Sequence, residues 1–164
     1  MHCFGQRRQA LIPPAGLLWA HMQVHTAVLR AVVVDAALSV AEHEALVAHP
    51  GAGAVVSFGG VVRDHDHGRT VEALEYVGHP TAEQIIAEVA AGIAAAGGVY
   101  AIAVSHRIGK LVVGDVALAC AVSSAHRREA FAACSRLVDE VKHRLPIWKR
   151  QVFEDGTDEW VDCP

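Results

Sequence analysis

The hydrophobic positions of the chain form continuous Val- and Ala-rich runs and longer segments with helical spacing. Residues 26–35 are the first continuous run, and their β-branched content predicts a strand long enough to cross a small sheet. Residues 53–62 are the second run and predict another strand. The pair Gly59–Gly60 inside this run indicates a β-bulge, or a point where another group approaches the backbone closely.

Two helix starts carry the pattern of a capping box, in which a hydroxyl residue is followed three positions later by Glu or Gln. Ser39 with Glu42 opens a short helix, and Thr81 with Gln84 opens an Ala-rich helix over residues 82–98. In both, we expect the hydroxyl oxygen to accept a hydrogen bond from a free backbone N–H of the first turn.

A third helix is predicted from about Ala125 to Leu145, because Pro146 forces the residue before it out of helical geometry. One face has the i, i+3, i+4 spacing of a buried stripe. The predicted stripe consists of Phe131, Cys134, Val138, Val141 and Leu145. Cys134 is then a packing residue rather than a nucleophile, and the same holds for Cys120 in an apolar strand.

The rest of the chain predicts further strands joined by turns. Residues 71–77 are predicted to be the return strand of a hairpin with residues 53–62. Later strands are predicted over residues 99–109, 111–124, 147–153 and 159–161, with turns near Gly109 and Gly114. Strands and helices in this mixed order favour an α+β fold over a doubly wound parallel sheet.

Length and composition fit a single domain with a substantial core, since 52% of the 164 residues are hydrophobic. We assign residues 26–164 to this domain and residues 1–25 to an N-terminal extension, a candidate for disorder in which Met22 is an alternative start. No apolar run reaches the roughly 18 residues of a membrane span. The four cysteines lie far apart without a C-x-x-C pair, which indicates a reduced, cytoplasmic setting.

Positive charge is concentrated at the two ends of the third predicted helix. The net charge of −4 argues against a broad nucleic-acid or anionic-membrane surface, so an anion site must be local. Arg127 and Lys142 lie near the edge of the apolar stripe, fifteen positions and therefore about 22 Å apart along a helix axis. One small ligand cannot touch both on the same helix, so a shared site requires two subunits.

The cations at the start of this helix call for a ligand more strongly than those at its end. The cluster His126–Arg128 favours an anion site, because free N–H groups and the helix dipole already attract anions there; the alternative is a solvated helix start. At the other end Lys142, His143 and Arg144 agree with the dipole, so His143 and Arg144 are explained equally well without a ligand.

Further cations are candidates for the same pocket. Lys149 and Arg150 follow Pro146 and Trp148 on an extended segment, where neighbouring side chains point to opposite sides. Arg63 follows the strand with the glycine pair and is placed to reach this pocket, the alternative being an arginine at the end of a hairpin.

Two other motifs are weak. Residues 64–67, Asp-His-Asp-His, include two histidines without a third ligand at a usual distance, so we expect no metal site and keep a metal-dependent enzyme using His65 and His67 only as a minor alternative. The glycine-rich residues 51–60 open a strand, whereas a dinucleotide-binding loop follows a strand and opens a helix.

Six blocks, in order, resemble the large subunit of molybdopterin synthase, the MoaE family. The blocks read FGGVVRDHDHG, LEY, HRIGKLVVGD, VSSAHRREAFAAC, VDEVKHRLPIWKR and DGTDEWV, and the resemblance as a whole spans about residues 51–161. The resemblance implies an α+β hammerhead-type fold with mixed and antiparallel sheets and about three helices. It also implies a homodimer that carries a small ubiquitin-like subunit of the MoaD type at each far end, a heterotetramer overall.

The activity implied by the resemblance is sulfur transfer without a cofactor of the subunit's own. The small subunit's C-terminal thiocarboxylate enters a pocket of the large subunit, and its sulfur passes twice to cyclic pyranopterin monophosphate to make the dithiolene of molybdopterin. By the same resemblance Lys142 and Lys149 are the catalytic residues. The implied binding pocket comprises Val61, Val62, Arg63, His126, Arg127, Lys149, Arg150 and Gln151.

Relatives more commonly have an acidic residue where Gln151 stands. A rival function for the same basic cluster is a non-catalytic module that binds a peptide carboxylate or a phosphorylated ligand.

Overall fold

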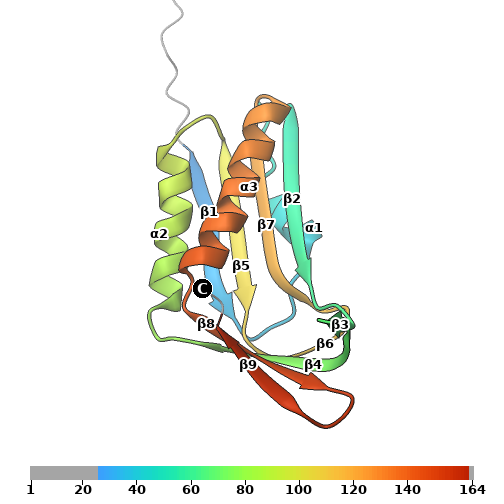
Figure 1. The fold of residues 1–164 in the computed structure, drawn as a ribbon. Helices are drawn as coiled ribbons and strands as arrows, with labels where there is room; N and C mark the ends of the chain where they lie inside the picture. The colour runs from blue at the N-terminus through green and yellow to red at the C-terminus, as the bar shows by residue number, and fades with distance from the viewer. Residues whose placement is uncertain (1–25, 163–164) are drawn as a thin grey trace, which may run out of the picture.

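The computed structural model describes residues 26–162, and the predicted extension over residues 1–25 lies outside them. The first of two sheets is a four-stranded mixed sheet (Figure 1). Its strands, in spatial order, are β1 (Ala27–Val34), β5 (Ala101–Arg107), β7 (Val116–Ser124) and β2 (Ala54–Val61). β1 runs parallel to β5, and the other two pairings are antiparallel. The α+β class is therefore confirmed.

Helices cover both faces of this sheet. α2 (Ala82–Ala95) and α3 (Arg127–Arg144) pack side by side on one face, and α1 (Val40–Leu46) packs on the other (Figure 1). Strand alternation supplies both cores: Val104 and Val122 face α2 and α3, while Ala103 and Ala121 face α1. The small side chains on the α1 face allow the short helix to lie close to the sheet. None of the helices in residues 26–162 is long and apolar enough to cross a membrane.

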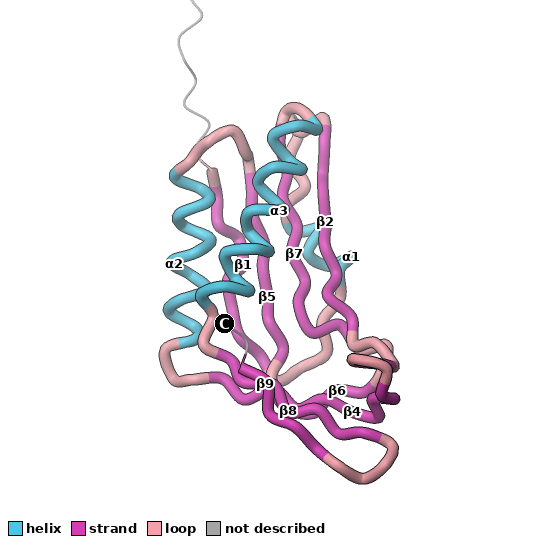
Figure 2. Tube along the Cα trace, viewed as in Figure 1, coloured by secondary structure: helices cyan, strands magenta, loops and turns pink. Residues whose placement is uncertain are grey.

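The second sheet lies across one end of the first, beneath the C-terminal end of α3 (Figure 2). This sheet comprises β3 (His65–Asp66), β4 (Arg69–Gly78), β6 (Gly109–Val112), β8 (Ile147–Phe153) and β9 (Asp158–Asp162). Its central strand, β4, pairs with β3, β6 and β8. A small core of its own includes Leu74, Leu111 and Phe153. The junction between the two sheets positions the candidate site.

Several local predictions are confirmed. Ser39 Oγ accepts a hydrogen bond from the Glu42 N–H at 3.2 Å, as expected of a capping box. The β2–β7 register shifts between Gly60 and Val61, which is the predicted irregularity. Gly114 has a φ of 94°, which agrees with the turn expected near it and divides the predicted strand 111–124 into β6 and β7.

The predicted hairpin between residues 53–62 and 71–77 is wrong. β2 pairs with β7 in the first sheet, whereas β4 pairs with β8 and β6 in the second. The polar segment instead forms the two-residue strand β3, whose tight turn into β4 has positive φ at His67 and Gly68. Residues 53–62 have the pattern of a mostly apolar strand and residues 71–77 that of an alternating one, and neither pattern says which strand the segment will pair with.

Two helix details are also corrected. Thr81 does not cap α2, because its hydroxyl hydrogen-bonds with His79 Nδ1 at 2.8 Å. Phe131 is 62% exposed rather than part of the buried stripe. The buried face of α3 has Ala130 in the place predicted for Phe131. It consists of Ala130, Cys134, Leu137, Val138 and Val141. An i+3 spacing alone did not distinguish Phe131 from Ala130.

Candidate functional site

Two adjoining cavities of about 410 and 450 Å³ lie where the two sheets meet the C-terminal end of α3. They share five lining residues and together form what we call the lysine cleft. The shared residues are Gly60, Val61, Tyr76, Lys142 and Lys149. The first cavity continues over apolar side chains such as Leu118 and Leu145, and the second continues over polar ones. The cleft can thus accept an elongated ligand with one apolar and one charged end.

Local chain geometry brings the two lysines into one cleft. Lys142 is in the last turn of α3, and Pro146 stops the helix and turns the chain into β8. The Pro146 carbonyl accepts a hydrogen bond from the His79 N–H at 2.9 Å, which anchors this turn to the end of β4. Along β8, alternation then directs Lys149 and Gln151 to the cleft side.

Arg150 points away from the cleft. Its Nε donates to Asp158 Oδ2 at 2.8 Å, and its Nη1 lies 3.5 Å from Glu75 Oε2. The pKa of Arg150 is raised, first by the hydrogen bond to Asp158. The structure therefore does not place Arg150 with the other predicted pocket residues, since it lies between Lys149 and Gln151 on an alternating strand.

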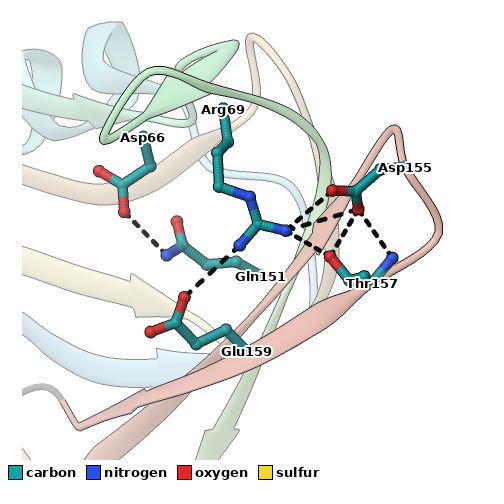
Figure 3. A network of polar contacts seen from close by, with 6 residues as sticks. All are labelled: Asp66, Arg69, Gln151, Asp155, Thr157 and Glu159. Carbon is teal, nitrogen blue, oxygen red and sulfur yellow. Dashed lines mark hydrogen bonds and ion pairs between the residues drawn. The ribbon is translucent and has the colours of Figure 1, made fainter.

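A buried carboxylate organises the polar end of the cleft. Asp66 is 9% exposed and accepts hydrogen bonds from Gln151 Nε2 at 2.8 Å (Figure 3) and from Arg63 Nη2. The pKa of Asp66 is held below its usual value, first by the bond from Gln151 and further by Arg63 and the nearby Lys149. Asp66 therefore stays ionised among the cations.

His106 contributes a neutral side chain to the apolar end of the cleft. Its Nδ1 lies 2.8 Å from the Arg107 carbonyl oxygen, and since a carbonyl only accepts, Nδ1 carries the proton. Burial, with the charge of Lys142 adding to it, lowers the pKa of His106 to about 4. Nε2 then carries no proton and can accept a hydrogen bond. The ring packs edge-on against Tyr76, with 5.2 Å between the ring centroids.

Asp66 and His106 were both missed by reasoning from sequence. For His106, the available signal was a histidine inside an otherwise apolar strand. For Asp66, its partner Gln151 is 85 positions away, so no local pattern joins them.

The N-terminal end of α3 forms a separate site. His126, Arg127, Arg128, Glu129 and Phe131 line an open hollow of about 400 Å³. Arg127 lines this hollow, whereas Lys142 lines the lysine cleft. The separation predicted from helix rise is therefore present: one subunit brings Arg63, Lys142, Lys149 and Gln151 together with Val61 and Val62, and leaves His126 and Arg127 at the far end.

Neither described cysteine is suited to carry sulfur. Cys120 and Cys134 are buried in the core beneath α3, and burial raises the pKa of both thiols, that of Cys134 to about 11. A thiol rather than a thiolate is a poor nucleophile, so both are packing residues as predicted.

The predicted Asp-His-Asp-His loop is occupied by internal contacts. Asp64 Oδ1 lies 2.7 Å from His65 Nδ1, and Asp66 accepts hydrogen bonds from Arg63 and Gln151. Within the part of the chain that the structure describes, no group of three or more His, Cys, Asp or Glu side chains is placed to hold a metal ion.

The chain is similar in sequence to proteins of one family. The model of the MoaE protein family matches residues 33–144. The molybdopterin synthase catalytic subunit of Nostoc sp. is 41% identical over 131 residues, 79% of each chain. That of Staphylococcus carnosus is 37% identical over 130 residues, covering 79% of this chain and 86% of its own.

Solved structures share the fold. The crystal structure of molybdopterin synthase from Staphylococcus aureus has a TM-score of 0.73 and 32% identity over 79% of this chain and 95% of that one. A complex of subunits 1 and 2 of molybdopterin-converting factor from Helicobacter pylori has a TM-score of 0.63 at 18% identity, over 80% of this chain and 88% of that one. A family match that includes all three helices, and relatives this similar over most of their length, show that the chain belongs to the MoaE family.

Proposed function

We propose that this chain is the catalytic subunit of a molybdopterin synthase. It transfers sulfur from the C-terminal thiocarboxylate of a small ubiquitin-like subunit to cyclic pyranopterin monophosphate, forming the dithiolene of molybdopterin. The observation that carries the proposal is the lysine cleft, where Lys142 and Lys149 line a cavity with one apolar and one polar end. Family membership supports the same activity.

The cleft suits a reaction between two anions. A thiocarboxylate and a cyclic phosphate repel each other, and the three cations Arg63, Lys142 and Lys149 offset that repulsion where the reactants meet. One lysine neutralises the thiocarboxylate, and the other transfers a proton as sulfur bonds to carbon. Water then cleaves the acyl–sulfur bond, so the sulfur stays on the pterin and the tail leaves as a carboxylate. Since Cys120 and Cys134 are buried and protonated, the sulfur comes from the partner and not from this chain.

The active unit in this proposal is a homodimer with two small subunits, a heterotetramer. Arg127 and His126 bind the substrate phosphate, because guanidinium and helix N–H groups match phosphate oxygens. They lie at the opposite end of α3 from Lys142, so a second copy must supply them to each cleft. The Helicobacter pylori protein of the same fold was solved as a complex of two subunits, which supports a small-subunit partner.

No cofactor of the chain's own takes part in this scheme, because the thiocarboxylate supplies the sulfur. A cytoplasmic location belongs to the same proposal. It is supported by Cys120 and Cys134, which are buried as free thiols.

Reconstitution tests the function. The purified protein is mixed with thiocarboxylated small subunit and cyclic pyranopterin monophosphate, and molybdopterin is assayed by chromatography. The matched control is the same small subunit ending in an ordinary carboxylate, which should bind and give no product. If the thiocarboxylated partner binds the folded protein and no product forms, the chain is instead a binding module for the partner's tail.

A further inference from the structure

The polar end of the lysine cleft contains one carboxylate, and each of its oxygens is held by a different segment of the chain. Oδ2 of Asp66 accepts from Gln151 Nε2 on β8, and Oδ1 accepts from Arg63 Nη2 at the end of β2. Asp66 itself lies on β3, three positions after Arg63, so a local contact from Arg63 and a long-range contact from Gln151 meet at one buried group.

The backbone around Asp66 is built to present it there. The turn after β3 has φ of 47° at His67 and 79° at Gly68, which reverses the chain immediately behind the carboxylate. The Val71 N–H donates to the Asp64 carbonyl at 2.8 Å and closes the other side of the loop. Val71 is 3% exposed, so its burial fixes the loop against the second core.

Gln151 holds the carboxylate in turn. It is 3% exposed, so its side chain has little freedom, and its amide N–H points at Asp66 (Figure 3). An amide is the group that suits this place, because a second carboxylate there would repel Asp66 at hydrogen-bond distance.

Arg63 differs from both partners in its exposure. Its side chain is 66% exposed, while that of Asp66 is 12% exposed. A flexible arginine with this exposure would sample many rotamers, and ordering it costs conformational entropy. The bond from Nη2 to Asp66 fixes one edge of the guanidinium, and the remaining N–H groups stay available beside Lys142 and Lys149.

We propose that Asp66, locked by Gln151, is a positioning residue of the sulfur-transfer site that pre-orients Arg63 for the anionic group of the pterin substrate. This inference rests on the proposed function for the identity of the substrate. Asp66 does not touch the substrate in this scheme; it acts through Arg63, whose guanidinium is held in place before the substrate arrives.

Substrate binding measured by calorimetry tests the inference without sulfur transfer. Cyclic pyranopterin monophosphate is titrated into wild-type protein, Asp66→Asn, Arg63→Ala and the double variant. We expect Arg63→Ala to weaken binding roughly ten- to hundredfold and Asp66→Asn roughly tenfold, since one loses and the other loosens a charge-assisted contact. In the Arg63→Ala background, Asp66→Asn should have almost no further effect, because nothing remains for it to position.

Controls separate this role from a merely structural one. Asp155→Asn alters a carboxylate that pairs with Arg69 outside the cleft and should leave substrate affinity unchanged. Thermal unfolding of each variant reports the fold; if Asp66→Asn does not fold, Asp66→Ser, which is smaller and keeps an acceptor, takes its place.

Additive losses from Arg63→Ala and the Asp66 variant would overturn the inference, as would an Asp66 variant that binds substrate like wild type. Failure of the proposed function has a different signature: wild-type protein would give no molybdopterin in the reconstitution, whatever the Asp66 variants do.

Discussion

At the scale of single residues, His106 is a histidine that the fold keeps neutral. Burial and Lys142 lower its pKa to about 4 in the folded protein, against about 6.5 in an unfolded chain. Between these values the unfolded state binds more protons, so this contribution to stability is complete above about pH 6.5 and is lost as the pH falls toward 4. We expect the loss between pH 7 and pH 5 to be about 2 kcal/mol.

Urea denaturation of wild type and His106→Gln at the two pH values measures this contribution. The wild type should lose about 2 kcal/mol more than the variant over that range. The carboxylates with lowered pKa, such as Asp155 at about 2, titrate below this window and are common to both proteins. Equal pH dependence in the two proteins would show that His106 titrates normally.

The two lysines of the cleft should differ from Lys110, the remaining lysine of the chain, in their effect on rate. If one is the proton-transfer group, its replacement by alanine should lower the single-turnover rate roughly 10²- to 10⁴-fold. Loss of the other, which only neutralises charge, should cost roughly ten- to hundredfold. Lys142→Ala and Lys149→Ala are measured with thiocarboxylated small subunit, and Lys110→Ala, exposed on β6 outside the cleft, is the control. Near-normal rates in both variants would remove the catalytic assignment.

How far sequence predicts single residues depends on how local their contacts are. The grouping of Lys142, Lys149 and Gln151 was predictable, because a proline fixes the step from α3 to an alternating strand. The same alternation turns Arg150, which the resemblance had included, to the other face of β8, where it binds Asp158. Asp66 was beyond reach, because its environment is created by a partner 85 positions away.

At the scale of elements, helix positions were predictable and strand partners were not. Pro146 is a local signal that ends α3, and both ends of α3 lie within two residues of the predicted bounds. Strand pairing depends on which apolar faces meet after collapse, and this information is distributed over the whole chain. For this reason β2 and β4, which are separated in sequence only by the short β3, belong to different sheets.

A network around Arg69 ties β4 to the β8–β9 hairpin (Figure 3). Its guanidinium lies 3.1 Å from Asp155, hydrogen-bonds Thr157 and stacks over Phe153 at 3.5 Å from the ring centroid. Exposed ion pairs and cation–π contacts stabilise modestly, so we expect Arg69→Ala to lower the melting temperature by only a few degrees. The more specific effect should be faster amide hydrogen exchange in β8 and β9, with α2 unchanged.

Arg136→Ala is the matched control for this change. Arg136 is exposed on α3 and forms no ion pair in the described part of the chain. Hydrogen exchange that rises equally in both variants would mean that the Arg69 network does not hold the hairpin.

At the scale of the whole molecule, the length of α3 divides the proposed site between two subunits. The helix has 18 residues, so Arg127 and Lys142 lie about 22 Å apart along its axis. A two-fold dimer would bring the start of one α3 to the lysine cleft of the other copy and make two equivalent sites. Each site would then need an intact Arg127 from one copy and an intact Lys142 from the other.

Mixing two inactive variants tests this division of the site. Arg127→Ala and Lys142→Ala proteins are each expected to be severely impaired. When they are unfolded together, refolded and assayed with thiocarboxylated small subunit, about half of the dimers should be hybrids. In each hybrid one site has both substitutions and the other has neither, so about a quarter of wild-type activity should return.

The companion mixture distinguishes complementation from simple stabilisation. Lys142→Ala and Lys149→Ala alter the same cleft of one subunit, so every site in their hybrids keeps one substitution and no activity should return. If the first mixture stays inactive although native mass spectrometry detects the hybrid dimers, each site draws on one subunit only. Arg127 would then act outside the sulfur-transfer site, and the hollow at the start of α3 would need another ligand.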